Sequence, residues 1–376
     1  MNKNKQTHQN DCIKGVGMKV LMLSTDKKIF EEGSDVRARM VQYGSLFDEL
    51  HIVVFTRGNE REERIAPNVV AHPTNTRSKV LYIVKAYRFC ADILKKNQNM
   101  MVTSQEGATS IVVFLLKLRF SFTFQAQVHT DFLSPHFHKE SFKNFLRFFI
   151  QSISMKHADC VRVVSERIKH SVIQELKIPE EKITVLPIFT DAEKIQEAHP
   201  VVLPKKFDYT LLWIGRLERE KNCALAIDAL SWLVDGGVDA GLVIVGKGSE
   251  RKKCEKRVES LGLGELVIFT GWVDDALGYY KSADVLLSTS WYEGYGLNMV
   301  AGRIAGLSVV ATDVGVAKEI GAHIVTHNAK GIAEVLRKVH TKELATQEQY
   351  EYPYKNKEEY LSLYKKSFEK CMTPHL

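Results

Sequence analysis

Short, continuously apolar segments recur along the chain, and each ends in Gly, Ser, Thr or His before an amphipathic stretch begins. Continuous rather than alternating hydrophobicity is typical of strands buried on both faces of a parallel sheet covered by helices. The pattern therefore predicts an α/β chain of strand, loop and helix units. We expect strands within residues 18–25, 50–58, 100–107, 122–130, 160–165, 211–215, 241–249, 266–271, 283–290 and 307–315.

The length of 376 residues exceeds that of most single hydrophobic cores, so we expect two domains. Helical and strand periodicity is lost around a short segment that carries two prolines, and a new apolar strand follows it. The apolar residues near the C-terminus recur at helical spacing. The expected parts are a tail at 1–17, a domain at 18–196, a linker at 197–206, a domain at 207–350 and a terminal helical segment at 351–376.

The N-terminus is polar where a signal peptide needs an apolar centre, and no apolar run is long enough to span a membrane. The six cysteines are scattered, with no CxxC pair and no His/Cys cluster. We therefore expect neither a zinc site nor a disulfide framework, and a cytoplasmic location fits this cysteine usage.

The net charge of +7 is unevenly distributed, because residues 77–119 hold eight Lys/Arg against only Asp92 and Glu106. Such a basic face attracts anionic lipid, nucleic acid or an acidic acceptor, and it is equally compatible with a solvated surface. A second basic segment mixes aromatic and cationic residues. Its members are Lys139, Phe142, Lys143, Phe145, Leu146, Arg147, Phe148 and Phe149. These residues fit either a membrane-facing helix or a helix whose apolar side is buried.

Ligands of open α/β sheets bind beyond the carboxyl ends of the strands, so the loops that follow the strands are the candidate sites. Gly215 follows one predicted strand, and Arg216 and Lys221 come shortly after it. Arginine and lysine in a loop that opens a helix suit a diphosphate. Gly246 and Gly248 follow the next strand of this domain, where glycine lets the flat ring of a ligand approach the backbone.

A third loop places a carboxylate directly before two glycines at the start of a predicted helix. Glu293 in this position can bind sugar hydroxyls, while the following backbone N–H groups face a phosphate or a sugar. The loop continues through Gly294, Tyr295, Gly296, Leu297 and Asn298. A structural glutamate is uncommon in such a loop, so this segment favours a binding function.

The segments GRLEREKN, LVIVGKGSE, FTGWVDDALGYYKSADVLLSTSWYEGYGLNMV and VVATDVGVAKEIG occur in this order over residues 207–325. Together they resemble the C-terminal half of the family 4 glycosyltransferases, the large retaining group with the GT-B fold. The segments QVHTDFLSPHF, RVVSERIKHSV and VLPIFTDAEKI resemble the N-terminal half more loosely. The resemblance implies two Rossmann-like domains that face each other across a cleft. It also implies a terminal helix that returns to the N-terminal domain.

The resemblance implies roles for several of these residues. Arg216 and Lys221 would bind the donor diphosphate, Glu293 would bind the transferred sugar, and His129 would lie near the reacting sugar. The backbone from Gly294 to Asn298 would cover the sugar and the phosphate. Gly33 occupies the loop after the first strand, where the family usually has a glycine facing the diphosphate.

Residue 301 departs from the family pattern, which has there a second glutamate that binds the nucleotide ribose. Ala301 stands in its place. A charge-assisted hydrogen bond contributes roughly 1.5–3 kcal/mol, so its loss weakens donor binding by about tenfold to over a hundredfold. Three explanations remain open: another ribose contact, a protein that has lost catalysis, or an introduced substitution.

The predicted activity is transfer of a sugar, with retention, from a UDP-sugar or GDP-mannose to a glycan, lipid-linked or small-molecule acceptor. No metal ion is required, because Asp274 and Asp275 lie in a loop rather than as a carboxylate pair at a strand end, and we expect no other cofactor besides the donor. The expected partners are the donor, the acceptor and an anionic surface at the cytoplasmic membrane face, but not nucleic acid. Two alternatives remain: a catalytically inactive nucleotide-binding or scaffold protein of the same fold, and a nucleotide-sugar epimerase.

Overall fold

The computed structural model describes residues 17–97, 99–105, 107–345, 347–348 and 350–372. The chain divides into two compact units, Met1–Gln125 and Ala126–Leu376. The segment expected to be a linker, 197–206, lies within the second unit between a helix and a strand. The expected domain boundary at this segment stays a prediction.

The first unit contains strands in the order β3-β4-β2-β1-β5, which are parallel except where β3 pairs with β4. Leu21 on the central strand is opposite His51 on one side and Val102 on the other. The elements are β1 (Lys19–Ser24), η1 (Lys27–Phe30), α1 (Asp35–Gly44), β2 (Glu49–Val54), β3 (Glu63–Ala66), β4 (Val69–Pro73), α2 (Lys79–Lys96), β5 (Met101–Ser104) and α3 (Ala108–Lys117).

Strand β6 (Phe124–Val128) crosses the boundary at Gln125, and the second unit continues with β7 and β8 in the order β6-β7-β8. Its helices begin with α4, which has Pro135 at its first turn. The elements of this part are α4 (Pro135–Glu140), α5 (Phe142–Lys156), β7 (Cys160–Val163), α6 (Glu166–Leu176), η2 (Glu180–Lys182), β8 (Ile183–Val185) and α7 (Ala192–Gln196).

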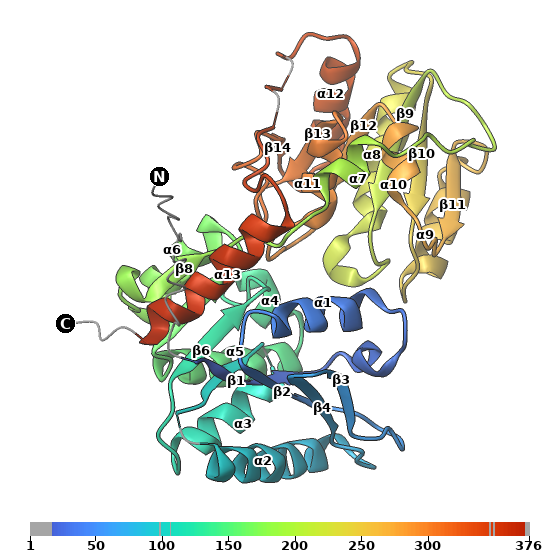
Figure 1. Ribbon diagram of the computed structural model, residues 1–376. Helices are drawn as coiled ribbons and strands as arrows, with labels where there is room; N and C mark the ends of the chain where they lie inside the picture. The colour runs from blue at the N-terminus through green and yellow to red at the C-terminus, as the bar shows by residue number, and fades with distance from the viewer. Residues whose placement is uncertain (1–16, 98, 106, 346, 349, 373–376) are drawn as a thin grey trace, which may run out of the picture. The chain divides into compact units, whose positions relative to one another are not determined.

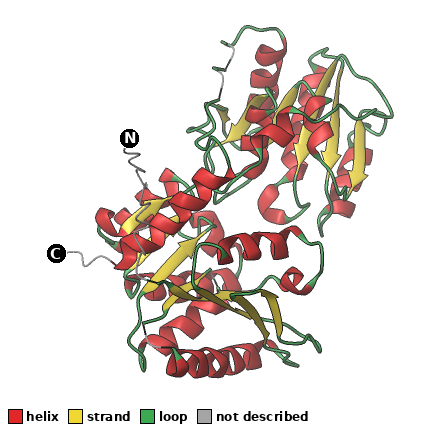
Figure 2. Ribbon diagram, in the orientation of Figure 1, coloured by secondary structure: helices red, strands yellow, loops and turns green. Residues whose placement is uncertain are grey.

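A six-stranded parallel sheet, in the order β11-β10-β9-β12-β13-β14, forms the rest of the second unit. Figure 2 shows its strands between helices. The elements are β9 (Tyr209–Ile214), η3 (Arg219–Lys221), α8 (Cys223–Asp235), β10 (Ala240–Val245), α9 (Arg251–Ser260), β11 (Val267–Gly271), α10 (Leu277–Lys281), β12 (Val285–Ser288), α11 (Leu297–Ile304), β13 (Ser308–Thr312), β14 (His323–Val325) and α12 (Ala329–His340).

The hydrophobic core around this sheet explains why the sequences of its strands are continuously apolar. Leu211, Leu242 and Leu287 come from three neighbouring strands and are fully buried, and α8 and α12 supply Leu230 and Leu336 against them. Every residue of β10 is buried, so both faces of the sheet are covered. The ten strands predicted from hydrophobic runs are confirmed, whereas β3, β4, β8 and β14 were not predicted.

The terminal helix α13 (Lys357–Met372) packs against β7 within the second unit (Figure 1). Tyr364 is buried on this helix, and its hydroxyl accepts a hydrogen bond from Gln127 Nε2 at 3.0 Å. The expectation of no disulfide is wrong at one place, because Cys160 and Cys371 form a disulfide with their Cα atoms 5.3 Å apart. Helix and strand thus join residues that are 211 positions apart.

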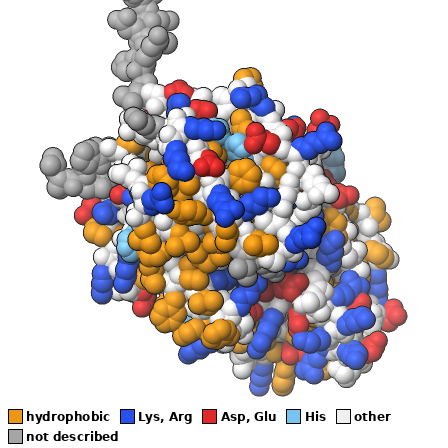
Figure 3. Space-filling view, turned by 90° about the horizontal axis from the view of Figure 1, so that it is seen from below, with side chains coloured by type: hydrophobic (Ala, Val, Ile, Leu, Met, Phe, Trp, Pro, Cys, Tyr) orange, Lys and Arg blue, Asp and Glu red, His pale blue; other side chains and the backbone are white. Residues whose placement is uncertain are grey.

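Exposed apolar side chains concentrate on α5, where Phe142, Phe145, Leu146, Phe149 and Ile153 are 43–81% exposed. Their spacing places them on one side of the helix. These five apolar side chains are therefore exposed, whereas the alternative expectation was that the apolar side of this helix is buried. A space-filling view shows a face on which hydrophobic side chains gather, bordered by lysines and arginines (Figure 3).

Candidate functional site

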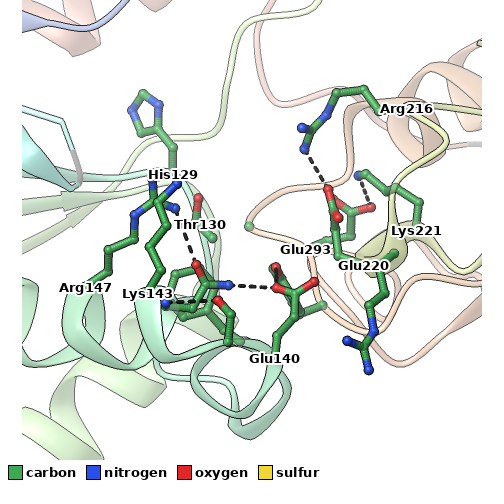
Figure 4. Close-up of a pocket in the computed structure, with 15 residues that line it drawn as sticks. His129, Thr130, Glu140, Lys143, Arg147, Arg216, Glu220, Lys221 and Glu293 are labelled. Carbon is green, nitrogen blue, oxygen red and sulfur yellow. Dashed lines mark hydrogen bonds and ion pairs between the residues drawn. The ribbon is translucent and has the colours of Figure 1, made fainter. Parts of the chain in front are cut away.

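A pocket of about 670 Å³ opens in the second unit where loops follow several parallel strands (Figure 4). The loop after β9 supplies Arg216 and Lys221, the loop after β12 supplies Glu293 and Gly294, and the residue after β6 is His129. The structure thus brings these five predicted residues into the lining of one pocket. This is the position that open α/β sheets use for ligands.

Lys221 and Glu293 form an ion pair in the pocket, with side chains only 18% and 10% exposed. Ser290 Oγ donates a hydrogen bond of 2.8 Å to the same carboxylate oxygen, Glu293 Oε1. Thr289 Oγ1 donates to the carbonyl of Asn222 at 2.9 Å, which ties the lysine loop to the end of β12. Because the pair is shielded from water, its attraction is stronger than that of an exposed pair. The glutamate therefore holds the lysine beside the pocket.

Arg216 is more loosely held than Lys221. Its guanidinium contacts Glu220 Oε1 at 2.8 Å, and its side chain is 69% exposed. Exposed pairs of this kind contribute little to stability, so the arginine can turn toward an incoming anion at small cost. The cationic Arg219 lines the same pocket.

Gly294 lies against the backbone at the end of β6. A Cβ atom at this position would be 1.7 Å from the carbonyl oxygen of His129, so only glycine fits without a shift of the backbone. Ser165 Oγ donates to the Gly294 carbonyl at 3.0 Å and fixes the loop from another side. The close approach accounts for the glycine that directly follows Glu293.

His129 is oriented by a buried arginine. Arg162 Nη1 lies 3.3 Å from His129 Nε2, and a guanidinium can only donate, so Nε2 accepts and the ring proton is on Nδ1. Arg162 is 2% exposed and also donates to Gln127 Oε1 at 2.9 Å and to the Leu186 carbonyl at 3.1 Å. The histidine is thus held as a neutral ring by residues from β6, β7 and the end of β8.

The start of α11 is shaped by Gly296, whose φ of +93° favours glycine. Tyr295 is 4% exposed, and burial raises the pKa of its hydroxyl. Leu297 is 44% exposed, and Asn298 Nδ2 donates to the Ile214 carbonyl at 3.1 Å. The asparagine therefore links α11 to the end of β9, and none of these residues lines the pocket beside Glu293.

Ala301 lies on α11 and is 7% exposed. Its carbonyl accepts the ordinary helical hydrogen bond from Ala305 N at 2.9 Å. The position carries a methyl group where the family pattern has a carboxylate, and its predicted contact with the ribose stays a prediction.

A second pocket of about 840 Å³ lies beside the first and is lined by Gly215, Gly246, Gly248 and Trp272. Arg216 lines both pockets. Trp272 is 60% exposed, so its ring is accessible. The three glycines were predicted to belong to one ligand site, and the structure places them together.

Two of these glycines also have a packing role. A Cβ on Gly246 would lie 1.9 Å from the Gly215 carbonyl oxygen, and a Cβ on Gly248 would lie 2.3 Å from the Leu217 carbonyl oxygen. The loop after β10 can therefore rest directly on the loop after β9. Glycine is thus required here because two backbone segments approach each other closely, whereas the sequence suggested that it allows a ligand to approach.

Sequence reasoning missed the other side of the first pocket. Tyr292 OH donates to Glu140 Oε2 at 2.8 Å, and burial together with the Glu140 charge raises the tyrosine pKa. Asn144 Nδ2 donates to the same carboxylate oxygen at 2.7 Å. Lys143 and Arg147, which the sequence suggested as surface cations, also line the pocket (Figure 4). Their helical spacing was visible in the sequence, but their distance from Glu293 was not.

Gly33 belongs to the first unit, where its φ is +76° and the next residue, Ser34, caps α1. Its predicted contact with the diphosphate stays a prediction. Within the described ranges, no group of three or more His, Cys, Asp or Glu side chains is placed to hold a metal ion. The helices of the described residues include none with the length and apolar character of a membrane span.

A family model described as "Glycosyl transferases group 1" matches residues 194–360, and one described as "Glycosyltransferase Family 4" matches residues 46–194. The chain belongs to these glycosyltransferases. Sucrose-phosphate synthase from Thermosynechococcus elongatus, at 18% identity, matches with a TM-score of 0.70 over 94% of this chain and 95% of that one. The likeness confirms the predicted GT-B fold for this chain.

Two curated relatives match part of the chain. The chain is 28% identical over 176 residues to 2-deoxystreptamine glucosyltransferase of Streptomyces kanamyceticus, and the match covers 44% of this chain and 46% of the relative. It is 36% identical over 113 residues to GDP-mannose-dependent alpha-(1-6)-phosphatidylinositol dimannoside mannosyltransferase of Mycobacterium tuberculosis, which covers 29% of each. The chain thus spans less than half the length of these two relatives.

Proposed function

We propose that this chain transfers a hexose, with retention and without a metal ion, from a nucleotide diphosphate sugar to a glycan or lipid-linked acceptor. The observation that carries the proposal is the Lys221–Glu293 pair with Arg216 at its side in one pocket. It combines cations for a diphosphate with a carboxylate for sugar hydroxyls. The relatives named above act with sugars, as their names state, and support the same class of substrate.

The cations act on the leaving group. Negative charge accumulates on the departing phosphate while the sugar acquires oxocarbenium character, and preorganised cations stabilise that charge. Lys221 is already positioned by Glu293, so little side-chain entropy is lost when a phosphate binds. Arg216 turns from its exposed contact with Glu220 to the same phosphate.

Transfer breaks the bond between the sugar C1 and the phosphate oxygen, and the nucleotide diphosphate departs with the bonding electron pair. The acceptor hydroxyl oxygen forms the new bond to C1 from the same face, and its proton passes to the departing phosphate oxygen. Glu293, paired with Lys221 and bonded by Ser290, binds sugar hydroxyls rather than attacking C1. A retaining route through a covalent intermediate would require a carboxylate nucleophile close to a second carboxyl group, as in glycosidases.

His129 positions the transferred sugar. Arg162 donates to its Nε2 atom and orients the ring, which lines the pocket. The close contact between Gly294 and the His129 carbonyl couples the position of this ring to the loop that carries Glu293. The position of the histidine is therefore tied to that of the sugar-binding carboxylate.

The pocket beside Trp272 suits the nucleotide base. Its glycine loops expose backbone groups that can bond the edge of a base, and the Trp272 ring offers a flat apolar surface. Lys247 Nζ lies 5.4 Å from the centre of that ring. UDP and GDP are the donor nucleotides that we propose to test first.

The acceptor side is cationic and continues into an exposed apolar surface. Lys143 and Arg147 line the pocket on α5, and the same helix exposes Phe142, Phe145 and Phe149. Cations next to a pocket and an adjoining apolar stripe suit an acceptor with an anionic head and a lipid tail at a membrane surface. The chemistry favours a lipid-linked acceptor over a free sugar.

Vesicle binding tests this acceptor class. The double variant Lys143→Glu/Arg147→Glu should lose sedimentation with phosphatidylglycerol vesicles, while neutral phosphatidylcholine vesicles bind neither protein. Lys252→Glu/Lys256→Glu on α9 makes the same charge change away from the pocket and serves as the control. Equal loss in both double variants would mean that only the net charge matters and would contradict an acceptor surface on α5.

One observation favours a second function. Ala301 removes the family carboxylate from a site whose diphosphate residues remain in place, which is what a nucleotide-binding protein without transfer activity would show. The two functions differ in turnover but not in nucleotide binding.

The proposed activity is tested by turnover. Radiolabelled UDP-glucose and GDP-mannose are incubated with the protein and with lipid-linked acceptors, and the anomeric configuration of the product is read by NMR. Retention and a large loss of rate in His129→Ala support the proposal. A normal rate in His129→Ala would remove the histidine from the site, and inversion would overturn the retaining mechanism.

A further inference from the structure

A third cavity, of about 700 Å³, lies in the second unit and has no role in the donor site. Its lining includes Asp131 and Arg167, together with Trp291 and His327 from the opposite side. Arg216, Lys221 and Glu293 are not part of that lining. The volume is within the roughly 300–1,000 Å³ that small-molecule sites occupy.

An aromatic surface forms one wall of the cavity. The rings of Trp291 and His327 are stacked with centroids 3.9 Å apart and planes 11° apart, and the His136 ring is 5.0 Å from Trp291. His327 Nε2 lies 3.1 Å from the Ser290 carbonyl, to which it donates. Burial lowers the pKa of His327, so its ring is neutral at neutral pH and the stacked pair is an uncharged aromatic surface. Flat apolar faces of this kind stack against the C–H face of a sugar ring.

A buried carboxyl group forms part of another wall. Asp131 is 8% exposed, and its Oδ1 atom has no hydrogen-bond partner among the described residues. Burial raises its pKa to about 6, against the opposing effects of the Arg167 charge and the Ser134 backbone N–H. The carboxyl group belongs to the lining of the cavity, so a hydroxyl group of a ligand in the cavity would lie beside a largely buried acceptor.

The charges of the lining indicate a neutral ligand. Arg167 is engaged by Asp313 and donates through Nε to the Gly315 carbonyl at 3.1 Å. The carboxyl groups of Asp131, Glu175 and Asp313 all line the cavity, so an anionic ligand would meet repulsion there. A polyhydroxylated neutral molecule offers hydroxyl donors to the carboxyl groups of the lining and an apolar face to the aromatic rings.

We propose that this cavity binds a neutral sugar unit of the acceptor, packed against the stacked Trp291–His327 pair with a hydroxyl beside the Asp131 carboxyl group. The inference rests on the proposed glycosyl transfer. Tyr292 lines both this cavity and the pocket that contains Glu293, and Asp131 is two residues after His129. A sugar bound here belongs to the same acceptor as the reacting unit, so the acceptor carries more than one sugar.

Direct sugar binding tests the proposal without turnover. Saturation-transfer NMR with maltose, cellobiose and lactose is recorded on the wild-type protein in the presence of UDP or GDP, which fills the donor site. At least one disaccharide should bind, and Trp291→Leu and Asp131→Leu should each weaken it by about tenfold or more. Trp232→Leu is the control, because this tryptophan is 51% exposed on α8 and lines neither cavity.

The same proteins are titrated with UDP and GDP to separate the two claims. Unchanged nucleotide binding in Trp291→Leu, together with lost disaccharide binding, supports a separate sugar subsite. Disaccharide binding that persists in both Trp291→Leu and Asp131→Leu overturns it, as does a wild-type protein that binds nucleotide but none of the disaccharides. If no nucleotide binds, the proposed transfer function fails, while the disaccharide result still decides whether the cavity holds a sugar.

Discussion

Breaking the Lys221–Glu293 pair from either side should change nucleotide affinity in opposite directions. The lysine is held by a carboxylate in a largely buried pair, and an incoming diphosphate must share it. In Lys221→Met the diphosphate loses a charge-assisted hydrogen bond of roughly 1.5–3 kcal/mol, a weakening of about tenfold to over a hundredfold. In Glu293→Gln the lysine is released from its internal anion.

The gain in Glu293→Gln is smaller than the loss in Lys221→Met. Ser290 can still bond the amide, and the pocket loses one negative charge near the bound phosphate. An exposed charge pair is worth up to about 1 kcal/mol and this largely buried pair is worth more, so UDP or GDP should bind at least about fivefold more tightly. Sugar transfer should nevertheless fall sharply, because the carboxylate that binds the sugar hydroxyls is gone.

Isothermal titration calorimetry with UDP and GDP measures both effects, and a turnover assay follows the loss of transfer. Lys253→Met is the control, since this lysine makes an exposed contact with Glu250 at 2.7 Å outside the pocket. If Glu293→Gln weakens nucleotide binding as much as Lys221→Met does, the two side chains do not compete for the diphosphate and the reasoning fails.

Two further predictions concern packing and pH. Gly294→Ala should destabilise the protein by about 1–3 kcal/mol in urea unfolding, because the new Cβ atom would collide with the His129 carbonyl oxygen. Gly264→Ala is the control, since a Cβ atom there meets open space and should leave the stability unchanged. Equal stability of the two variants would contradict the close contact at Gly294. Burial lowers the pKa of His72 below its usual 6.5, so the stability that its neutral form contributes is present above that pH and is lost as pH falls through the folded-state pKa. His72→Gln should therefore lose less stability than wild type between about pH 7.5 and about pH 5 in urea titrations, and parallel losses would refute the assignment.

The strands that could be predicted are the ones that carry continuous apolar runs. The apolar runs LLWI and LVIV predicted β9 and β10, because both faces of each strand are buried. β3 could not be predicted, because its residues ERIA are half-exposed and pair only with β4 at the edge of the sheet. β14 has only three residues, too few for a periodic pattern.

The candidate site could be predicted where local order along the chain places a residue at a strand end. Lys221 and Glu293 were found in this way, although they are 72 positions apart. Asp131 could not be recognised, because the burial of its carboxyl group depends on packing that no local pattern records. The Cys160–Cys371 disulfide could not be predicted for the same reason, since the two cysteines are far apart in the sequence and no local pattern indicates that they pair.

The most direct test of the central claim is a calorimetric titration of this protein and of Ala301→Glu with UDP, GDP and ADP. The account predicts that one nucleotide diphosphate binds the wild-type protein. Restoring the family carboxylate should tighten it by about tenfold to over a hundredfold, the contribution of a charge-assisted hydrogen bond to the ribose. If none of the three nucleotides binds either protein, the pocket around Lys221 and Glu293 is not a donor site.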